Sequence, residues 1–225
     1  MEEASQAVPT SSAPAYPTCS GSTGTGRSAS TSRQLSVLQM PAGSGESSLP
    51  FSSGAVSGTF SVRVFKADFK FNAAHFIAYS GFRERLHGHN YRVGVEMWTG
   101  SGRAQLEADG YVMDFGQIKR TLRAECKALN ERFLCPCASD VLRISFPAGN
   151  TQLQIDCEDG SMFSFPRADC AELPIVHSSV EELAVFFSDR LISAMREELV
   201  QRGIDRVEVT VAEAPGQSAS YSVTR

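Results

Sequence analysis

The chain has 225 residues, 42% of them hydrophobic, and a formal net charge of −4 at pH 7. These values are typical of a globular protein with one medium-sized domain, and the scattered, mildly acidic charge argues against a nucleic-acid-binding protein. No apolar run is long enough to cross a membrane, and the acidic N-terminus lacks the basic and apolar parts of a secretory signal. We therefore expect a cytoplasmic protein whose six cysteines are reduced.

Residues 1–57 are rich in Ser, Thr, Gly, Ala and Pro and contain few charged or large aliphatic side chains. Such a segment buries too little apolar surface to offset the conformational entropy that it would lose on ordering. We predict a disordered tail over residues 1–57 and a folded domain over residues 58–225.

The folded part begins with two stretches of alternating apolar and polar residues, which predict β-strands over about 59–75 and 87–98. Phe65, Ala67, Phe69, Phe71 and Ala73 share the apolar phase of the first strand with His75. Residues two apart on a strand share a face, so His87 and His89 project together with Tyr91, Val93, Val95 and Met97. If the two strands pair in antiparallel fashion, the three histidines converge from one buried face.

Three of the four histidines in the chain thus belong to one predicted cluster. A single histidine on an apolar face is more often a satisfied core residue than a metal ligand. Three imidazoles in one phase of two strands are much harder to explain in that way. Three neutral nitrogens with an open fourth position are typical of a catalytic zinc site, so we predict that His75, His87 and His89 bind Zn²⁺.

The middle of the chain predicts one helix followed by an insert. After a glycine-rich loop, apolar residues recur at helical spacing over 115–133, and Pro136 ends the helical region. Residues 138–173 contain short alternating runs between turn signals and predict an inserted β-hairpin or small meander with a structural role or an oligomer contact. The close pair Cys135 and Cys137 is interpreted as small residues after a helix rather than as a redox or metal site.

The C-terminal part predicts a second helix and two strands. Ser179 and Glu182 have the spacing of a capping box, and the helix that follows ends near Gly203. A strand over 206–213 places Glu213 in its apolar phase, where a carboxylate is costly unless a ligand pairs with it; the alternative is a strand-end residue turned into solvent. With a final strand over 218–223, the order is β-β-α-(insert)-α-β-β, an α+β fold with an antiparallel sheet.

These motifs resemble the 6-pyruvoyl-tetrahydropterin synthase and 6-carboxytetrahydropterin synthase family over about residues 59–223. The matching segments are FNAAH at 71–75, HGHNY at 87–91, GYVMDF at 110–115, SVEELA at 179–184 and VAE at 211–213. The resemblance implies a tunnelling fold (T-fold), with two helices on one face of an antiparallel sheet. It also implies Zn²⁺ on the three histidines, a pterin gripped by Glu213 with Ser179 in the same substrate site, and a homohexamer, a dimer of trimers, with active sites between subunits.

Two departures from the family pattern concern the acid–base residues. The usual cysteine shortly before His-x-His is missing, and residues 81–86 read GFRERL. This resembles the protozoan variant in which a glutamate replaces that cysteine, with Glu84 at the matching position; the alternative is a solvated loop charge between two arginines. In place of the family's Asp-His pair the chain has Asn130 and Glu131, which makes Glu131 the candidate for the second proton carrier.

The resemblance to the glutamate variant implies a zinc-dependent lyase that cleaves the side chain of 7,8-dihydroneopterin triphosphate to 6-hydroxymethyl-7,8-dihydropterin, a folate precursor. Glu84 is expected to remove the 2′-hydroxyl proton, and Arg83, Arg85 or Lys66 to meet the triphosphate. Two alternatives stay open. One is 6-pyruvoyl-tetrahydropterin synthase activity for tetrahydrobiopterin biosynthesis, which the missing cysteine disfavours. The other is a pterin-binding protein without turnover, which Asn130 and Glu131 favour.

Overall fold

The computed structural model describes residues 58–101, 106 and 108–225, and the tail predicted over residues 1–57 lies outside these residues. None of the helices in this part of the chain is long and apolar enough to cross a membrane. The elements are β1 (Ser61–His75), β2 (Ala78–Tyr79), β3 (Phe82–Arg83), β4 (His87–Thr99), α1 (Phe115–Leu129), β5 (Arg132–Pro136), β6 (Arg143–Ser145), α2 (Pro147–Asn150), β7 (Gln152–Asp156), β8 (Met162–Pro166), the 3₁₀ turn η1 (Arg167–Asp169), β9 (Cys170–Leu173), α3 (Val180–Gln201), β10 (Ile204–Ala214) and β11 (Gln217–Thr224).

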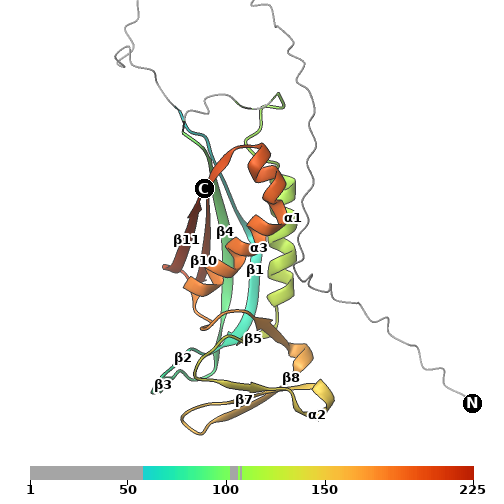
Figure 1. The fold of residues 1–225 in the computed structure, drawn as a ribbon, viewed down its shortest axis with the longest axis vertical. Helices are drawn as coiled ribbons and strands as arrows, with labels where there is room; N and C mark the ends of the chain where they lie inside the picture. The colour runs from blue at the N-terminus through green and yellow to red at the C-terminus, as the bar shows by residue number, and fades with distance from the viewer. Residues whose placement is uncertain (1–57, 102–105, 107) are drawn as a thin grey trace, which may run out of the picture. The chain divides into compact units, whose positions relative to one another are not determined.

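A six-stranded sheet in the order β11-β10-β4-β1-β5-β9 forms the body of the fold (Figure 1). Helices α1 and α3 cover one face of this sheet, and their apolar sides share a core with β1, β4 and β10. The predicted α+β class, the helices on one face and the order β-β-α-(insert)-α-β-β are therefore confirmed.

Two strands of this sheet, β5 and β9, were not predicted, and they make it mixed rather than purely antiparallel. β5 runs parallel to β1, and β9 runs parallel to β5, whereas the other neighbours are antiparallel. The predicted helix is too long because Phe133 continues its apolar spacing by coincidence. α1 ends at Leu129, and Glu131, with a φ of 59°, turns the chain so that Phe133 enters β5.

The apolar phase of β1 changes at a bulge. The pairing of β1 with β4 shifts between Phe65 and Lys70, which inverts the alternation because side chains on a strand repeat every two residues. Beyond the bulge, Phe69, Phe71, Ala73 and His75 are buried as predicted, but the expected burial of Phe65 and Ala67 is wrong. Phe65 lies instead against Gly94 of β4, where a Cβ atom would collide with its ring.

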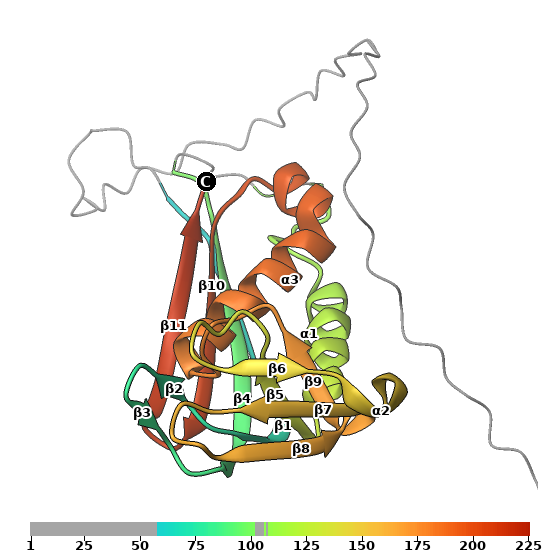
Figure 2. The ribbon, with the colours of Figure 1, turned by 60° about the horizontal axis from the view of Figure 1, so that its bottom comes forward.

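The insert is a three-stranded antiparallel sheet in the order β6-β7-β8, so the predicted meander is confirmed. The last residues of the predicted insert form β9, which belongs to the main sheet through its pairing with β5. Leu142, Leu153 and Ile155 of the insert share a second apolar cluster with Phe76 and Phe133. Figure 2 shows the insert beside the β2–β3 hairpin, at the end of the main sheet where β1 ends and β4 begins.

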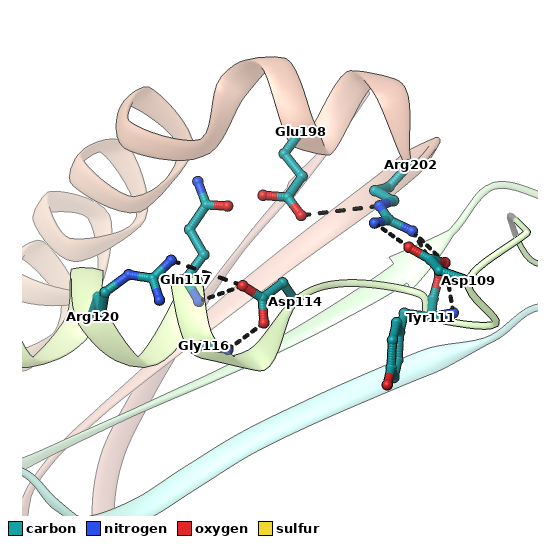
Figure 3. Close-up of polar contacts among 8 residues, drawn as sticks. All are labelled: Asp109, Tyr111, Asp114, Gly116, Gln117, Arg120, Glu198 and Arg202. Carbon is teal, nitrogen blue, oxygen red and sulfur yellow. Dashed lines mark hydrogen bonds and ion pairs between the residues drawn. The ribbon is translucent and has the colours of Figure 1, made fainter.

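At the opposite end of the sheet, polar contacts join the end of α3 to the loop that leads into α1 (Figure 3). Arg202, at the end of α3, donates hydrogen bonds of 2.9 and 2.7 Å to the two carboxylate oxygens of Asp109. Asp114 is the N-cap of α1 and accepts from the backbone N–H groups of Gly116 and Gln117. These contacts fix the two helices at the end of the molecule remote from the histidines.

Candidate active site

His75, His87 and His89 meet where β1 ends and β4 begins. His75 is opposite His87 in the antiparallel ladder, and His89 is opposite Ala73. The three rings have centroids 4.5, 4.9 and 5.1 Å apart, and one nitrogen from each lies within 4.8 Å of the others. The cluster is compact enough to hold one metal ion.

Backbone carbonyls set the tautomers of two of these histidines. Nδ1 of His75 lies 2.8 Å from the carbonyl oxygen of Ser178, and Nδ1 of His87 lies 2.8 Å from that of Arg85. A carbonyl oxygen can only accept, so each Nδ1 carries the proton and each Nε2 keeps its lone pair, the form in which metal-binding histidines are usually held. Nε2 of His75 is buried and has no hydrogen-bond partner among the described residues, and a bound metal ion would satisfy it.

The surroundings of His75 favour the neutral, metal-binding imidazole. Burial lowers the pKa of His75 to about 4, although the Ser178 carbonyl acts in the opposite direction. Next to it, the Tyr91 ring stacks on Phe71 with centroids 4.7 Å apart and faces His75 and His89 edge-on. Burial also raises the pKa of the Tyr91 hydroxyl, so His75 and Tyr91 are both neutral near pH 7.

Close approach of β1 and β4 depends on a glycine between two of the histidines. Gly88 pairs with Ala74, and a Cβ atom at Gly88 would lie 2.9 Å from the carbonyl oxygen of Ala73. That contact is with backbone, which cannot rotate away as a side chain can. Glycine therefore keeps the strand that carries His87 and His89 close to the strand that carries His75.

The Ser178 carbonyl that meets His75 is itself held by two groups. The side-chain hydroxyl of Ser178 donates to the carbonyl oxygen of Phe76 at 3.0 Å. The segment just before Ser178 is held by the Glu182 carboxylate, which accepts from the backbone N–H groups of Val176 and His177 at 2.7 and 3.0 Å. Ser179 caps α3 as predicted, by accepting from the Glu182 N–H. The other half of the predicted capping box is wrong, because the Glu182 side chain binds these earlier N–H groups rather than that of Ser179.

Glu84 lies beside the histidines and is half-buried. One oxygen of its carboxylate accepts from the backbone N–H of Ile77 at 3.0 Å, and its own backbone N–H donates to the Ile77 carbonyl at 2.9 Å. Ile77 follows His75 by two residues, so these two bonds fix Glu84 next to the end of β1. The negative charge of Glu84 acts to raise the pKa of both His75 and Tyr91. Glu84 is therefore close enough to both side chains to interact with them electrostatically.

Glu213 lies on the other side of the cluster. A carboxylate oxygen of Glu213 is 3.8 Å from Nε2 of His89, and a bulge in β10 between Ala212 and Ala214 sets the direction of this side chain. Its side chain is 25% exposed, so it is accessible to a ligand without being turned fully into solvent. A carboxylate in this place can accept hydrogen bonds from a ligand bound next to the histidines.

Asn130 and Glu131 have a structural role within the chain. The Asn130 side-chain oxygen accepts from the Asn72 N–H at 2.9 Å, and the Glu131 N–H donates to the Asn72 carbonyl at 2.6 Å. The Glu131 side chain is exposed, and among the described residues no hydrogen bond or ion pair joins it to the histidines. His177, the fourth histidine, also lies outside the metal cluster, with a buried Nδ1 that has no partner among the described residues.

Two groups that support the site could not be predicted from the sequence. Ser178 acts on His75 through its backbone carbonyl, which any residue type could supply, so the sequence carries no signal for it. Arg83, a candidate for triphosphate binding, is instead paired with Asp159 in the insert, while Lys66 and Arg85 are exposed. Asp159, the partner of Arg83, lies 76 positions away in the sequence, so no local sequence pattern predicts this contact.

The family model for 6-pyruvoyl tetrahydropterin synthase matches residues 64–223. A relative from Methanocaldococcus jannaschii, named for 6-carboxy-5,6,7,8-tetrahydropterin synthase, is 26% identical over 155 residues, which cover 69% of this chain and 90% of the relative. The structure of 6-pyruvoyl tetrahydropterin synthase from Plasmodium falciparum is 40% identical, with a TM-score of 0.69, and covers 74% of this chain and 99% of that one.

A structure of the Plasmodium vivax 6-pyruvoyltetrahydropterin synthase, in which alanine replaces a glutamate described as a catalytic residue, has the same identity and TM-score. It covers 75% of this chain and 99% of the Plasmodium vivax chain. The agreement in sequence and in structure extends over nearly all of the described residues and confirms the T-fold. This chain therefore belongs to the 6-pyruvoyl tetrahydropterin synthase family, whose members are lyase-type enzymes of pterin biosynthesis.

Proposed function

We propose that this protein is a zinc-dependent lyase that converts 7,8-dihydroneopterin triphosphate to 6-hydroxymethyl-7,8-dihydropterin. The observation that carries the proposal is the position of Glu84, whose carboxylate is held on the Ile77 N–H two residues after His75. A glutamate is described as a catalytic residue in the Plasmodium vivax relative, which supports a catalytic role for a glutamate in this family. By the resemblance of the motifs, Glu84 matches the family's cysteine position, and its carboxylate next to His75 supports that role.

His75, His87 and His89 would hold the zinc ion. The unpartnered Nε2 of His75 and the two Nδ1–carbonyl contacts fit a metal bound on the Nε2 side of His75 and His87. When bound, the ion supplies Lewis acidity that lowers the pKa of a coordinated hydroxyl.

Glu84 would act as the general base. It takes the proton of the 2′-hydroxyl, C2′ becomes an aldehyde carbon, and the C1′–C2′ bond breaks. The electron pair of that bond is left on C1′ and is delocalised into the pterin ring until C1′ takes up a proton. The products are 6-hydroxymethyl-7,8-dihydropterin and a two-carbon aldehyde that keeps the triphosphate, so no oxidant or reductant is needed. Protonated Glu84 can return the proton to C1′, and Glu131 of a neighbouring subunit is the second candidate.

Glu213 and Ser179 would bind the pterin. The Glu213 carboxylate is an acceptor for the 2-amino and N3 hydrogens, and a ring that lacks these donors would leave it unpaired. The Ser179 oxygen already accepts from the Glu182 N–H, which leaves its own O–H free to donate to substrate. Because Arg83 is paired with Asp159 and Lys66 lies nine residues before His75 on β1, about 30 Å along the strand, the exposed Arg85 is the better candidate for the triphosphate.

We also propose the homohexamer. The main sheet ends in β11 on one side and β9 on the other, and an edge strand can pair with another chain. Such an assembly, with a mass of six times 24.3 kDa, would bring residues from neighbouring copies to each histidine cluster.

The test is incubation of the purified zinc-loaded protein with 7,8-dihydroneopterin triphosphate, with the products separated by chromatography. We expect 6-hydroxymethyl-7,8-dihydropterin from the wild type and a loss of about 100-fold or more in kcat for Glu84→Gln, the usual contribution of a general base. Glu197→Gln, a change of an exposed glutamate on α3, is the matched control and should be fully active. Release of triphosphate with a 6-pyruvoyl product would show ordinary synthase activity, and pterin binding without turnover would show a binding protein.

A further inference from the structure

Arg83 connects the Glu84 loop to the insert. Its Nε and one terminal nitrogen lie 2.9 and 2.8 Å from the same carboxylate oxygen of Asp159, and that terminal nitrogen also donates to the Ser161 hydroxyl at 3.0 Å. Asp159 and Ser161 belong to the turn between β7 and β8. The Arg83 side chain is only 18% exposed, so this is a shielded contact rather than a loose surface pair.

The same guanidinium group reaches the neighbouring residue in the loop. Its other terminal nitrogen donates to the backbone carbonyl of Glu84 at 2.8 Å. Its planar face lies 5.8 Å from the ring centre of Phe76 and 5.3 Å from that of Phe163. All three guanidinium nitrogens are therefore engaged, in a planar arrangement that the single ammonium group of a lysine cannot reproduce.

A second contact joins the hairpin to the insert independently of Arg83. The Glu158 carboxylate accepts from the backbone N–H of Gly81 at 3.0 Å, where the chain turns with a φ of 78°. Beside these contacts, a cavity of about 170 Å³ separates the hairpin from the insert, lined among others by Tyr79, Phe82 and Leu142. Because the two segments are not closely packed around this cavity, the polar contacts add to the apolar packing of Phe76 and Phe163 in holding the loop.

We propose that the insert positions the catalytic loop, and that Arg83 and Asp159 are positioning residues that set the location of the Glu84 carboxylate. This inference rests on the role of Glu84 given under the proposed function. Arg83 holds the backbone of Glu84 at one end, and the Ile77 N–H holds its carboxylate at the other. Loss of the Arg83–Asp159 contact frees the chain between Gly81 and Leu86, and the carboxylate leaves its position next to His75.

The test compares two variants that alter opposite sides of the contact. Asp159→Asn and Arg83→Lys should each lower kcat by about tenfold or more, as a misplaced catalytic group does, while zinc content stays at the wild-type level. Hydrogen exchange at the amides of Ile77 and Glu84 should become faster in both variants, because these two N–H groups report the bonds between Ile77 and Glu84. Asp159→Glu, which keeps the charge, should recover part of the lost kcat.

The matched control is Arg143→Gln. It removes an ion pair of 3.2 Å between Arg143 and Asp156 in the same insert. Within the described part of the chain, no hydrogen bond or ion pair joins either residue to the hairpin. Its kcat and its exchange at Ile77 and Glu84 should equal those of the wild type. If Asp159→Asn does not fold, Ser161→Ala, which removes one bond to Arg83, carries the same test.

The proposal would be overturned if a folded Asp159→Asn protein kept the wild-type kcat. It would also be overturned if Arg143→Gln lost as much kcat as Asp159→Asn does. Failure of the proposed function gives a different result. In that case the wild type makes no 6-hydroxymethyl-7,8-dihydropterin, or Glu84→Gln keeps full activity, and the exchange at Ile77 and Glu84 alone decides whether the insert holds the loop.

Discussion

At the scale of single residues, His75 is the most constrained part of the site. It is 2% exposed, its Nδ1 is bonded to a carbonyl, and its Nε2 has no partner among the described residues. A buried polar nitrogen without a partner destabilises a fold by about 1–3 kcal/mol, and a metal ion at Nε2 would remove that cost. The protein should therefore be measurably more stable with metal than without it.

Zinc should raise the Tm of the metal-free protein, because it binds the folded chain through three histidines that are apart in the unfolded chain. At a free zinc concentration of about a hundred times Kd, the expected gain is about 3 kcal/mol in the free energy of unfolding. His75→Asn should abolish the gain, whereas His177→Asn should keep it, since His177 is outside the cluster. Calorimetric scans with and without zinc measure the difference, and a full gain in His75→Asn would contradict the predicted ligand set.

Gly88→Ala should weaken the same site without touching a ligand. The new methyl group would lie 2.9 Å from the Ala73 carbonyl oxygen, so β4 must move away from β1 between His87 and His89. We expect a fall of about tenfold or more in zinc affinity and a loss of about 1–3 kcal/mol in stability, the usual cost of overpacking. Titration with zinc measures the affinity.

Gly100→Ala is the control for this change. A Cβ atom there would meet its nearest neighbour at 3.6 Å, an ordinary contact. Equal zinc affinities of the two alanine variants would show that close approach at Gly88 is unimportant for the site.

At the scale of elements, the contact between the end of α3 and the loop that leads into α1 has a defined pH dependence (Figure 3). The hydrogen bonds from Arg202 lower the pKa of Asp109 to about 2. The folded pKa is thus below the unfolded value of about 3.9, so the ionised carboxylate stabilises the fold above about pH 4, and this contribution is lost as the pH falls through about 2.

Asp109→Asn should therefore lower Tm at neutral pH, and the difference from the wild type should shrink between about pH 4 and pH 2. Thermal scans of the metal-free proteins across this range provide the comparison, since the histidines release metal in acid. A difference that stays constant or grows as the pH falls would mean that Arg202 does not favour the charged form of Asp109.

The elements that the sequence predicts correctly are those with a long, regular pattern. The alternation on β4 from His87 to Met97 places both histidines on the face that carries the buried Tyr91, although His87 itself is exposed and His89 is half-buried. The period of two depends only on local backbone geometry. The metal cluster was predictable for this reason. β5 and β9, of five and four residues, were not, because such short strands are defined by the neighbours with which they pair.

The contacts that support the site join residues far apart in the sequence, so local sequence patterns do not predict them. The bulge that exposes Phe65 leaves the apolar alternation of the sequence intact and shows only in the pairing of β1 with β4. Arg83 and Asp159 meet because the insert folds back on the hairpin, which depends on packing around Phe76 and Phe163 rather than on spacing. Sequence reasoning therefore locates the histidine cluster that could hold a metal ion and the candidate base, but not the groups that hold them in place.

At the scale of the whole molecule, the position of Glu131 bears on assembly. Its backbone is bonded to Asn72, which precedes His75 by three residues, or about 10 Å along a strand. Its side chain is exposed and makes no ion pair or hydrogen bond with the histidines of its own chain among the described residues. If Glu131 takes part in proton transfer, it acts in the site of a neighbouring copy.

Mixed oligomers test this arrangement directly. Glu84→Gln and Glu131→Gln should each be inactive alone, but co-assembled chains should recover activity, because some sites then combine an intact Glu84 from one variant with an intact Glu131 from the other. Random mixing of equal amounts leaves about a quarter of the sites complete in a symmetric assembly. Product formation by the co-expressed variants, compared with the wild type at equal zinc content, is the measurement. Mixed oligomers that form but stay inactive would place both residues in the site of a single chain, and full activity of Glu131→Gln alone would remove Glu131 from the reaction.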